Sequence, residues 1–274
     1  MKAGVDGKGN DAPSKGVLIN KSYTPRLTCC GCAFMNTKTP EGYTPTTIEH
    51  IMNCLTHAIP ALISIYGLYA LVKEAEDRPV EKFIAWIYGV TLIMLFSIST
   101  VYHISNLIEK LKQFTPILQK LDHAVIFIFI AASYTPWLML TDLGSSNMLG
   151  KWFVVLVWFI AVIGTFRFLF ARSHPQFLLL ALGWIVVLLA NPIYNSKVPF
   201  YAMLEVLLGG LFYSFGAILL NMDGIVPFSH ALWHIMTTAA AAFHYHSIYT
   251  YLITYQNEEI MEITLKEFIS SVME

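Results

Sequence analysis

Long apolar runs alternate with short charged or polar segments along most of the chain. A helix that crosses a bilayer needs about 20 mostly apolar residues in succession and makes all its backbone hydrogen bonds internally. Seven runs approach this length, although the fifth is short and ends at Asn191-Pro192, where proline disfavours further helix. The pattern predicts an all-α bundle of seven transmembrane helices, covering residues 49–72, 83–103, 122–140, 151–171, 176–190, 199–220 and 230–255.

The two ends of the chain differ from this central part. Residues 1–45 show no apolar period and are predicted to form a flexible N-terminal tail. Residues 256–274 are predicted to form an acidic C-terminal tail, so the seven-helix domain is expected to fill residues 46–255. An odd number of spans places the two termini on opposite sides of the membrane.

Basic residues near the spans predict the orientation of the bundle. The side of the N-terminus would carry Lys21, Arg26, Lys38, Lys110, Lys112, Lys120, Arg167 and Arg172. The other side would carry Lys73, Arg78, Lys82, Lys151, Lys197 and Lys266, diluted by many acids. Lysine and arginine close to spans mark the cytosolic side, whereas acids count for little. We therefore expect a cytosolic N-terminus and a luminal or extracellular C-terminus.

Composition supports a membrane protein and excludes other classes. The chain has 274 residues, of which 56% are hydrophobic and only 13% are charged. A soluble domain is nearer to about a quarter charged, which disfavours a large soluble all-helical protein. The net charge of -1 gives no reason to expect a nucleic-acid partner. Because the first forty residues are polar, we expect no cleaved signal peptide, and the first span would act as its own insertion signal.

Several polar residues fall within the predicted spans, where they are costly and need an explanation. His103 lies in the last turn of the second span, and Ser99 lies one turn earlier on the same face. Asp122 opens the third span. His230 and His234 open the seventh span with i, i+4 spacing, so both imidazoles project from one face. The predicted topology brings all of these residues to the cytosolic boundary at one membrane depth.

Three histidines and an aspartate at one depth predict a zinc site. Neutral imidazoles suit zinc, and three protein ligands leave a fourth position for water, as in catalytic sites. His103, His230 and His234 are the predicted ligands. Asp122 could orient the water or accept its proton, and Ser99 could hydrogen-bond a ligand or a substrate oxygen. The alternative is that histidines near helix ends extend toward the interface without binding metal.

Other polar residues receive weaker assignments. Glu49, Asn53 and His57 form a stripe along one face of the first span, either as outer partners of the metal site or as a helix cap with a polar contact between helices. Glu205 is expected to lie away from the metal and is given no role. His244 and His246 are expected to serve packing or polar bonds between helices.

The four cysteines do not form a disulfide pattern, because three of them cluster before the first span and the fourth, Cys54, lies at its start. Cys29, Cys30 and Cys32 could be palmitoylated, since they precede the first span on the predicted cytosolic side. Equally, they could be unmodified thiols. A metal bound there would need a fourth ligand that the neighbouring sequence does not offer.

Four sequence strings carry a resemblance to a known family. They are PTTIEHIMNCLTHA at the first span, AWIYGVTLIMLFSISTVYH at the second, FIAASYTPW in the third and GIVPFSHALWH leading into the seventh. The chain resembles the progestin and adipoQ receptor (PAQR) family, also called the hemolysin III-related family. Within that family it is most similar to the monocyte-to-macrophage differentiation factor group.

The resemblance implies a seven-helix membrane fold with an intracellular zinc site. The SxxxH motif of the family falls on Ser99 and His103, its third-helix aspartate on Asp122, and its HxxxH motif on His230 and His234. Family members and the related alkaline ceramidases are linked to zinc-dependent hydrolysis of ceramide amides. The subgroup implies residence in the Golgi, another endomembrane or the plasma membrane, with a signalling role.

One departure limits what the resemblance implies. Glu49 and Asn53 are separated by three residues, whereas the adiponectin-receptor branch has two. Binding of adiponectin or of a steroid is therefore not expected on this ground, and protein partners stay unknown.

Three functions compete on this evidence. The first is a zinc-dependent hydrolase of a ceramide-like lipid amide, whose catalytic groups would be Asp122 and Ser99. The second is a receptor or signalling scaffold in which zinc ties helices together. A lipid-sized cavity that reaches the metal would favour the enzyme, and a closed, dry bundle the scaffold. A pore is disfavoured, because no span has a polar stripe wide enough to line a channel.

Overall fold

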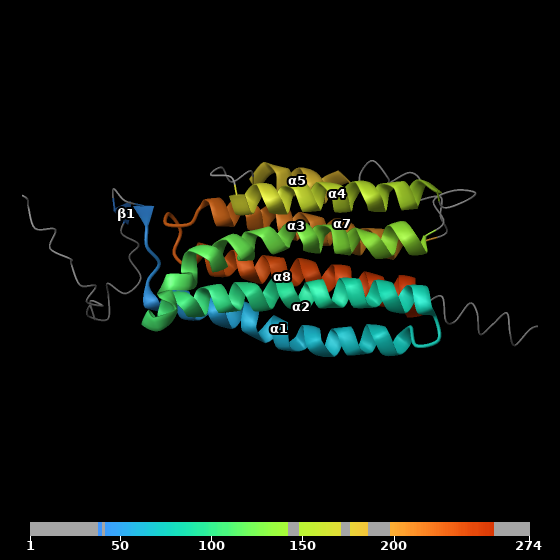
Figure 1. Ribbon diagram of the computed structural model, residues 1–274, viewed down its shortest axis with the longest axis horizontal. Coiled ribbons are helices and arrows are strands. Elements are labelled where there is room, and N and C mark those ends of the chain that lie inside the picture. The colour runs from blue at the N-terminus through green and yellow to red at the C-terminus, as the bar shows by residue number, and fades with distance from the viewer. Residues whose placement is uncertain (1–37, 40–41, 142–147, 171–175, 186–197, 255–274) are drawn as a thin grey trace, which may run out of the picture. The chain divides into compact units, whose positions relative to one another are not determined.

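A computed structural model describes residues 38–39, 42–141, 148–170, 176–185 and 198–254. Its helices lie side by side (Figure 1). They are α1 (Thr47–Glu74), α2 (Pro79–Leu107), the 3-10 helix η1 (Glu109–Phe114), α3 (Thr115–Leu140), α4 (Met148–Phe170), α5 (Gln176–Trp184), α7 (Phe200–Asn221), α8 (Ser229–Ser247) and its π-helical continuation η3 (Ile248–Thr254). Each of the seven apolar runs thus contains a described helix.

Five of the described segments are long and apolar enough to cross a membrane: α1, α2, η1 with α3, α4 and α7. The other two helices differ from them in length or polarity. α5 has nine residues, and residues 186–190 of the fifth run lie outside the described residues. The seventh run is helical from Ser229 to Thr254, but α8 carries four histidines.

Most helix ends lie within a few residues of the sequence-based expectation, but the start of the third helix differs by two turns. The third helix begins at Thr115 rather than at Asp122, so Asp122 lies two turns inside it. Pro116 occupies the first turn, where the missing N–H of proline costs nothing. Strands β1 (Lys38–Thr39) and β2 (Gly42–Tyr43) pair antiparallel within the segment that was expected to be unstructured. Cys29, Cys30, Cys32 and the acidic C-terminal tail lie outside the described residues.

Neighbouring helices pack in an order that places α8 against both α7 and α1. α1 packs against α2, α2 against α3, and α3 against α4. Buried aromatic and aliphatic side chains join α2, α3 and η3, including Tyr88, Phe96, Phe129 and Ile248. Many large apolar side chains instead point outward, such as Tyr66, Phe83, Trp152, Phe159 and Phe170. An outward apolar surface is what a lipid-facing bundle requires.

The contact between α7 and α8 depends on a glycine. A Cβ atom built at Gly209 would lie 3.1 Å from the Ala240 carbonyl oxygen and closer still to the His244 ring. Its neighbour Gly210 has room, because a Cβ atom there would lie 3.6 Å from the nearest atom of Trp184. Small residues at such contacts allow membrane helices to approach closely.

Gly209→Ala is therefore expected to destabilise the bundle by about 1–3 kcal/mol, the usual cost of overpacking. Gly210→Ala is the matched control, because both changes bring the same gain in helix propensity. Thermal melting of the two variants in detergent micelles compares them directly. Equal melting temperatures would contradict the close α7–α8 contact.

Candidate metal centre

Three histidines from two helices meet in the structure. His103 on α2 and His230 and His234 on α8 each offer a ring nitrogen, and these atoms lie within 4.8 Å of one another. The ring centroids are 4.7–5.0 Å apart. His103 and His234 are almost fully buried, whereas His230 retains partial exposure. The structure thus brings together the three residues that the sequence predicted as ligands.

Hydrogen bonds to the Glu49 carboxylate connect the start of α1 to the start of α8. Its Oε2 accepts a hydrogen bond from the Thr46 N–H at 2.8 Å, and the Thr46 hydroxyl accepts one from the Glu49 N–H, which makes a capping box. Its Oε1 accepts a hydrogen bond from the Phe228 N–H at 3.2 Å. Phe228 immediately precedes α8 and has a left-handed φ of 58°. Of the two roles left open for Glu49, the structure shows the cap, and its contact with Phe228 holds α8 near α1.

The contacts of His234 fix which of its nitrogens faces the cluster. Nδ1 lies 3.2 Å from the Asn53 carbonyl oxygen and 3.1 Å from the Thr56 Oγ1. A carbonyl oxygen can only accept, so Nδ1 carries the proton. The Thr56 hydroxyl donates to the Met52 carbonyl at 2.8 Å, which leaves its oxygen free to accept as well. The lone pair of His234 is therefore on Nε2 and is available to a metal.

The ring of His103, unlike that of His234, is not oriented by hydrogen bonds to described residues. Neither of its ring nitrogens has a hydrogen-bond partner among the described residues, although the side chain is only 2% exposed. Buried polar groups are nearly always paired, because leaving one unpaired costs free energy. A metal ion at the cluster would satisfy one of these nitrogens.

The residues present fit a zinc ion. Zinc binds imidazole nitrogens at about 2.0–2.1 Å, so three tetrahedral ligands lie roughly 3.3–3.5 Å from one another. The 4.8 Å limit between the nitrogens therefore requires only a small side-chain adjustment. Imidazole suits zinc among other transition metals, and a donor set without oxygen disfavours magnesium and calcium.

Asp122 and Ser99 lie on the cavity side of the cluster. Both line the same cavity as His230 and His234. The Asp122 carboxyl lies within electrostatic range of His230, although it is not part of the cluster itself. Ser99 is one turn before His103 on α2 and is 2% exposed. Both residues thus have access to a molecule in the cavity.

Three residues near the cluster were missed or left open by the sequence. His57 stacks on His234 with ring centroids 3.7 Å apart. Thr56 contacts His234, as described above, and Asp223 Oδ2 lies 3.4 Å from His230 Nδ1. The stripe on the first span signalled His57. No spacing signalled Thr56 or Asp223, because their contacts depend on how α1 and the α7–α8 turn pack against α8.

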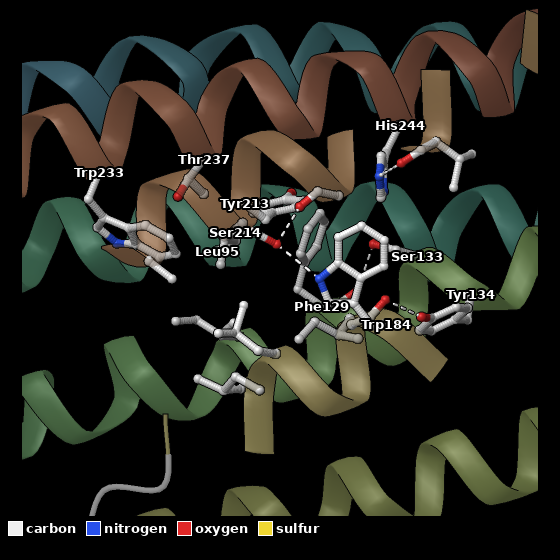
Figure 2. Close-up of a pocket in the computed structure, with 18 of the residues that line it drawn as sticks. Leu95, Phe129, Ser133, Tyr134, Trp184, Tyr213, Ser214, Trp233, Thr237 and His244 are labelled. Atoms are coloured by element: carbon white, nitrogen blue, oxygen red, sulfur yellow. Dashed lines mark hydrogen bonds between the residues drawn. The ribbon is translucent and has the colours of Figure 1, made fainter. Parts of the chain in front are cut away.

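A cavity of about 410 Å³ reaches the cluster. It extends between α2, α3, α5, α7 and α8 and is lined mostly by apolar side chains (Figure 2). Two hydrogen bonds join residues of its wall: the Trp184 Nε1–H donates to Ser214 Oγ at 2.9 Å, and the Tyr134 hydroxyl donates to the Leu182 carbonyl at 3.1 Å. The cavity thus combines a polar end at the histidines with an apolar body.

The two remaining histidines of α8 contact α7 through polar groups. His244 Nε2 lies 3.2 Å from the Val206 carbonyl oxygen, and His246 Nδ1 lies 2.8 Å from Glu205 Oε2. These contacts agree with the polar bonds between helices expected for His244 and His246. Glu205 lies outside the metal cluster, as expected, and pairs with His246.

Comparison with known proteins identifies the family of this chain. A family model described as "Haemolysin-III related" matches residues 46–245. The chain belongs to the haemolysin III-related family. The match begins at the cap of α1 and ends in α8 beyond His234, so it includes the whole histidine cluster. Together with the apolar helices, membership of the haemolysin III-related family makes the chain a multi-pass membrane protein.

Individual relatives in the haemolysin III-related family match over most of their length. Monocyte to macrophage differentiation factor from Homo sapiens is 38% identical over 226 residues, which cover 80% of this chain and 92% of that protein. Hemolysin-3 from Bacillus cereus is 30% identical over 211 residues, covering 75% and 92%. The Hemolysin-3 homolog from Bacillus subtilis (strain 168) is 33% identical over 208 residues, covering 72% and 91%. These matches confirm the resemblance seen in the sequence.

Proposed function

We propose that this protein is a zinc-dependent hydrolase of a ceramide-like lipid amide, with a role in signalling. The observation that carries the proposal is the cavity, because its apolar body reaches His230, His234, Asp122 and Ser99 at one end. A lipid amide has the matching shape: a polar reacting group joined to a long apolar chain. A zinc ion that only ties helices together in a scaffold would need no such cavity.

Each residue has a distinct task in this proposal. His103, His230 and His234 would hold the zinc through imidazole nitrogens. Zinc held by three protein ligands supplies a Lewis acid and a water whose pKa is lowered toward about 7. A carboxylate oxygen of Asp122 would take up the proton of the attacking water and later return it to the leaving amine. The Ser99 hydroxyl would donate to the oxygen on which negative charge develops.

The rest of the cavity would bind and orient the substrate. Its apolar side chains, among them Leu95, Phe129 and Leu207, would hold the acyl chain and exclude water from the polar end. Fixing the chain in this way places the amide next to Asp122 and Ser99. Such positioning uses the binding energy of the remote acyl chain to lower the barrier for reaction at the amide bond.

The test of the proposal is fatty-acid release from ceramides. Purified protein in mixed micelles receives ceramides of several chain lengths, before and after metal removal and after zinc is returned. Release that requires zinc is expected. Equal release by metal-free protein would mean that the activity is a contaminant, and the scaffold with structural zinc would then be preferred.

We also propose that all seven helices span the membrane, with α5 and α8 as the fifth and seventh spans. The N-terminus is then cytosolic and the C-terminus luminal or extracellular, in the Golgi, another endomembrane or the plasma membrane. The basic residues on the N-terminal side support this orientation. A glycosylation tag should be modified at the C-terminus only; modification at the N-terminus would reverse the assignment.

A further inference from the structure

We infer that Asp223 is a positioning residue for the metal, which orients His230 so that its Nε2 faces the ion. This inference rests on the zinc site of the proposed function. It begins from the contact of 3.4 Å between Asp223 Oδ2 and His230 Nδ1. A carboxylate oxygen can only accept, so its presence beside Nδ1 favours the tautomer of the neutral imidazole with the proton on Nδ1 and the lone pair on Nε2.

The two α8 histidines are then oriented in the same way from opposite sides. His234 directs its Nδ1 proton to α1, through the Asn53 carbonyl and Thr56. His230 turns its Nδ1 toward the α7–α8 turn, where the Asp223 carboxylate lies 3.4 Å away. Both Nε2 atoms are left for one ion. Metal-binding histidines commonly donate their second N–H to a carboxylate or a carbonyl in this manner.

The turn that carries Asp223 is well defined. Gly224 has a φ of 75°, a conformation that glycine adopts without strain. The Ile225 and Val226 N–H groups donate to the Met222 carbonyl at 2.9 and 3.0 Å, and the Asp223 N–H donates to the Leu220 carbonyl at 3.2 Å. The backbone on both sides of Asp223 is therefore held, which fixes its carboxylate beside the first turn of α8.

Charge gives Asp223 a second effect on the ion. Three neutral imidazoles leave both positive charges of zinc uncompensated, which is costly in apolar surroundings. Asp122 approaches the cluster from the cavity and Asp223 from the turn. Glu49 also lies near, but both of its carboxylate oxygens already accept hydrogen bonds, from Thr46 and Phe228. Asp223 therefore compensates charge on the side away from the substrate.

Zinc affinity measures this role without any turnover. Asp223→Ala in the full-length protein is expected to weaken zinc binding by about 10–100-fold, the usual effect of removing an outer carboxylate partner. The affinity is read from competition with a zinc chelator in detergent. Asp77→Ala is the matched control, because Asp77 is an exposed acid in the turn between α1 and α2. The control should bind zinc like the wild type.

Melting of the zinc-free proteins separates positioning from a structural role. If Asp223 only stabilised the turn, its replacement would lower the melting temperature of the zinc-free protein and leave zinc affinity unchanged, which would overturn the inference.

Asp223→Asn keeps the side-chain size and suits a turn, so it decides the question if the alanine variant fails to fold. It should also weaken zinc binding, because it removes the charge. A wild type that binds no zinc would refute the proposed site as well, whereas tight binding by wild type and variants alike would refute the role of Asp223 alone.

Discussion

Replacing Asp122 by asparagine is expected to slow fatty-acid release from ceramide by about 10²–10⁴-fold, the usual contribution of a general base. The amide of asparagine fills the same space but cannot take up a proton from water. Asp122 lines the cavity and lies outside the histidine cluster, so zinc should remain bound. The rate is measured with purified protein in mixed micelles at saturating ceramide.

Zinc content and thermal melting of the Asp122→Asn variant must match the wild type for this comparison. With both unchanged, a rate within twofold of the wild type would remove Asp122 from the chemistry. Ser99→Ala provides a second comparison, since the loss of one donor to a developing negative charge costs about 10²–10³ in rate. A fall in both variants would place the reacting amide between α2 and α3.

Replacing His234 by alanine is expected to strip most of the zinc. His234 is the most completely buried of the three histidines and its Nε2 is oriented by α1. Two remaining imidazoles make a poor zinc site. The affinity should fall by more than the roughly 10–100-fold that loss of an outer partner costs. Elemental analysis of purified protein after dialysis against a weak chelator measures the loss.

His244→Ala is the matched control for this variant. His244 lies on the same helix and bonds to the Val206 carbonyl, but it is outside the cluster. This control should keep its full zinc content. Full zinc in His234→Ala would remove His234 from the ligand set, and equal loss in both variants would indicate general damage to α8.

The helices could be predicted from the sequence because a bilayer imposes a simple length and polarity rule. The start of α3 could not. Residues 115–123 contain Gln119, Lys120, Asp122 and His123, which made this stretch resemble a loop. A helix in the interface does not need apolar residues, since water and head groups solvate its side chains. Its helical backbone therefore extends seven residues before Asp122.

The histidine cluster could be predicted because two of its members share one helix face and the third lies at a matching depth on another span. Its supporting contacts could not be predicted. Thr56 looks like many hydroxyls that bond to their own helix, as it also does to Met52. In the sequence Asp223 looks like any acidic residue of a loop, because its contact with His230 forms only when the α7–α8 turn folds. The cavity likewise depends on side-chain packing among several helices, which no single segment encodes.

The most direct test of the central claim is zinc K-edge X-ray absorption of the purified wild-type protein. Three histidines predict nitrogen or oxygen ligands at about 2.0–2.1 Å and no sulfur ligand at about 2.3 Å. Fitting of imidazole scattering should require about three rings per zinc, as in sites with three protein ligands. A sulfur shell, which would place the metal at cysteines such as Cys29, Cys30 and Cys32, or a protein that binds no zinc, would contradict the account.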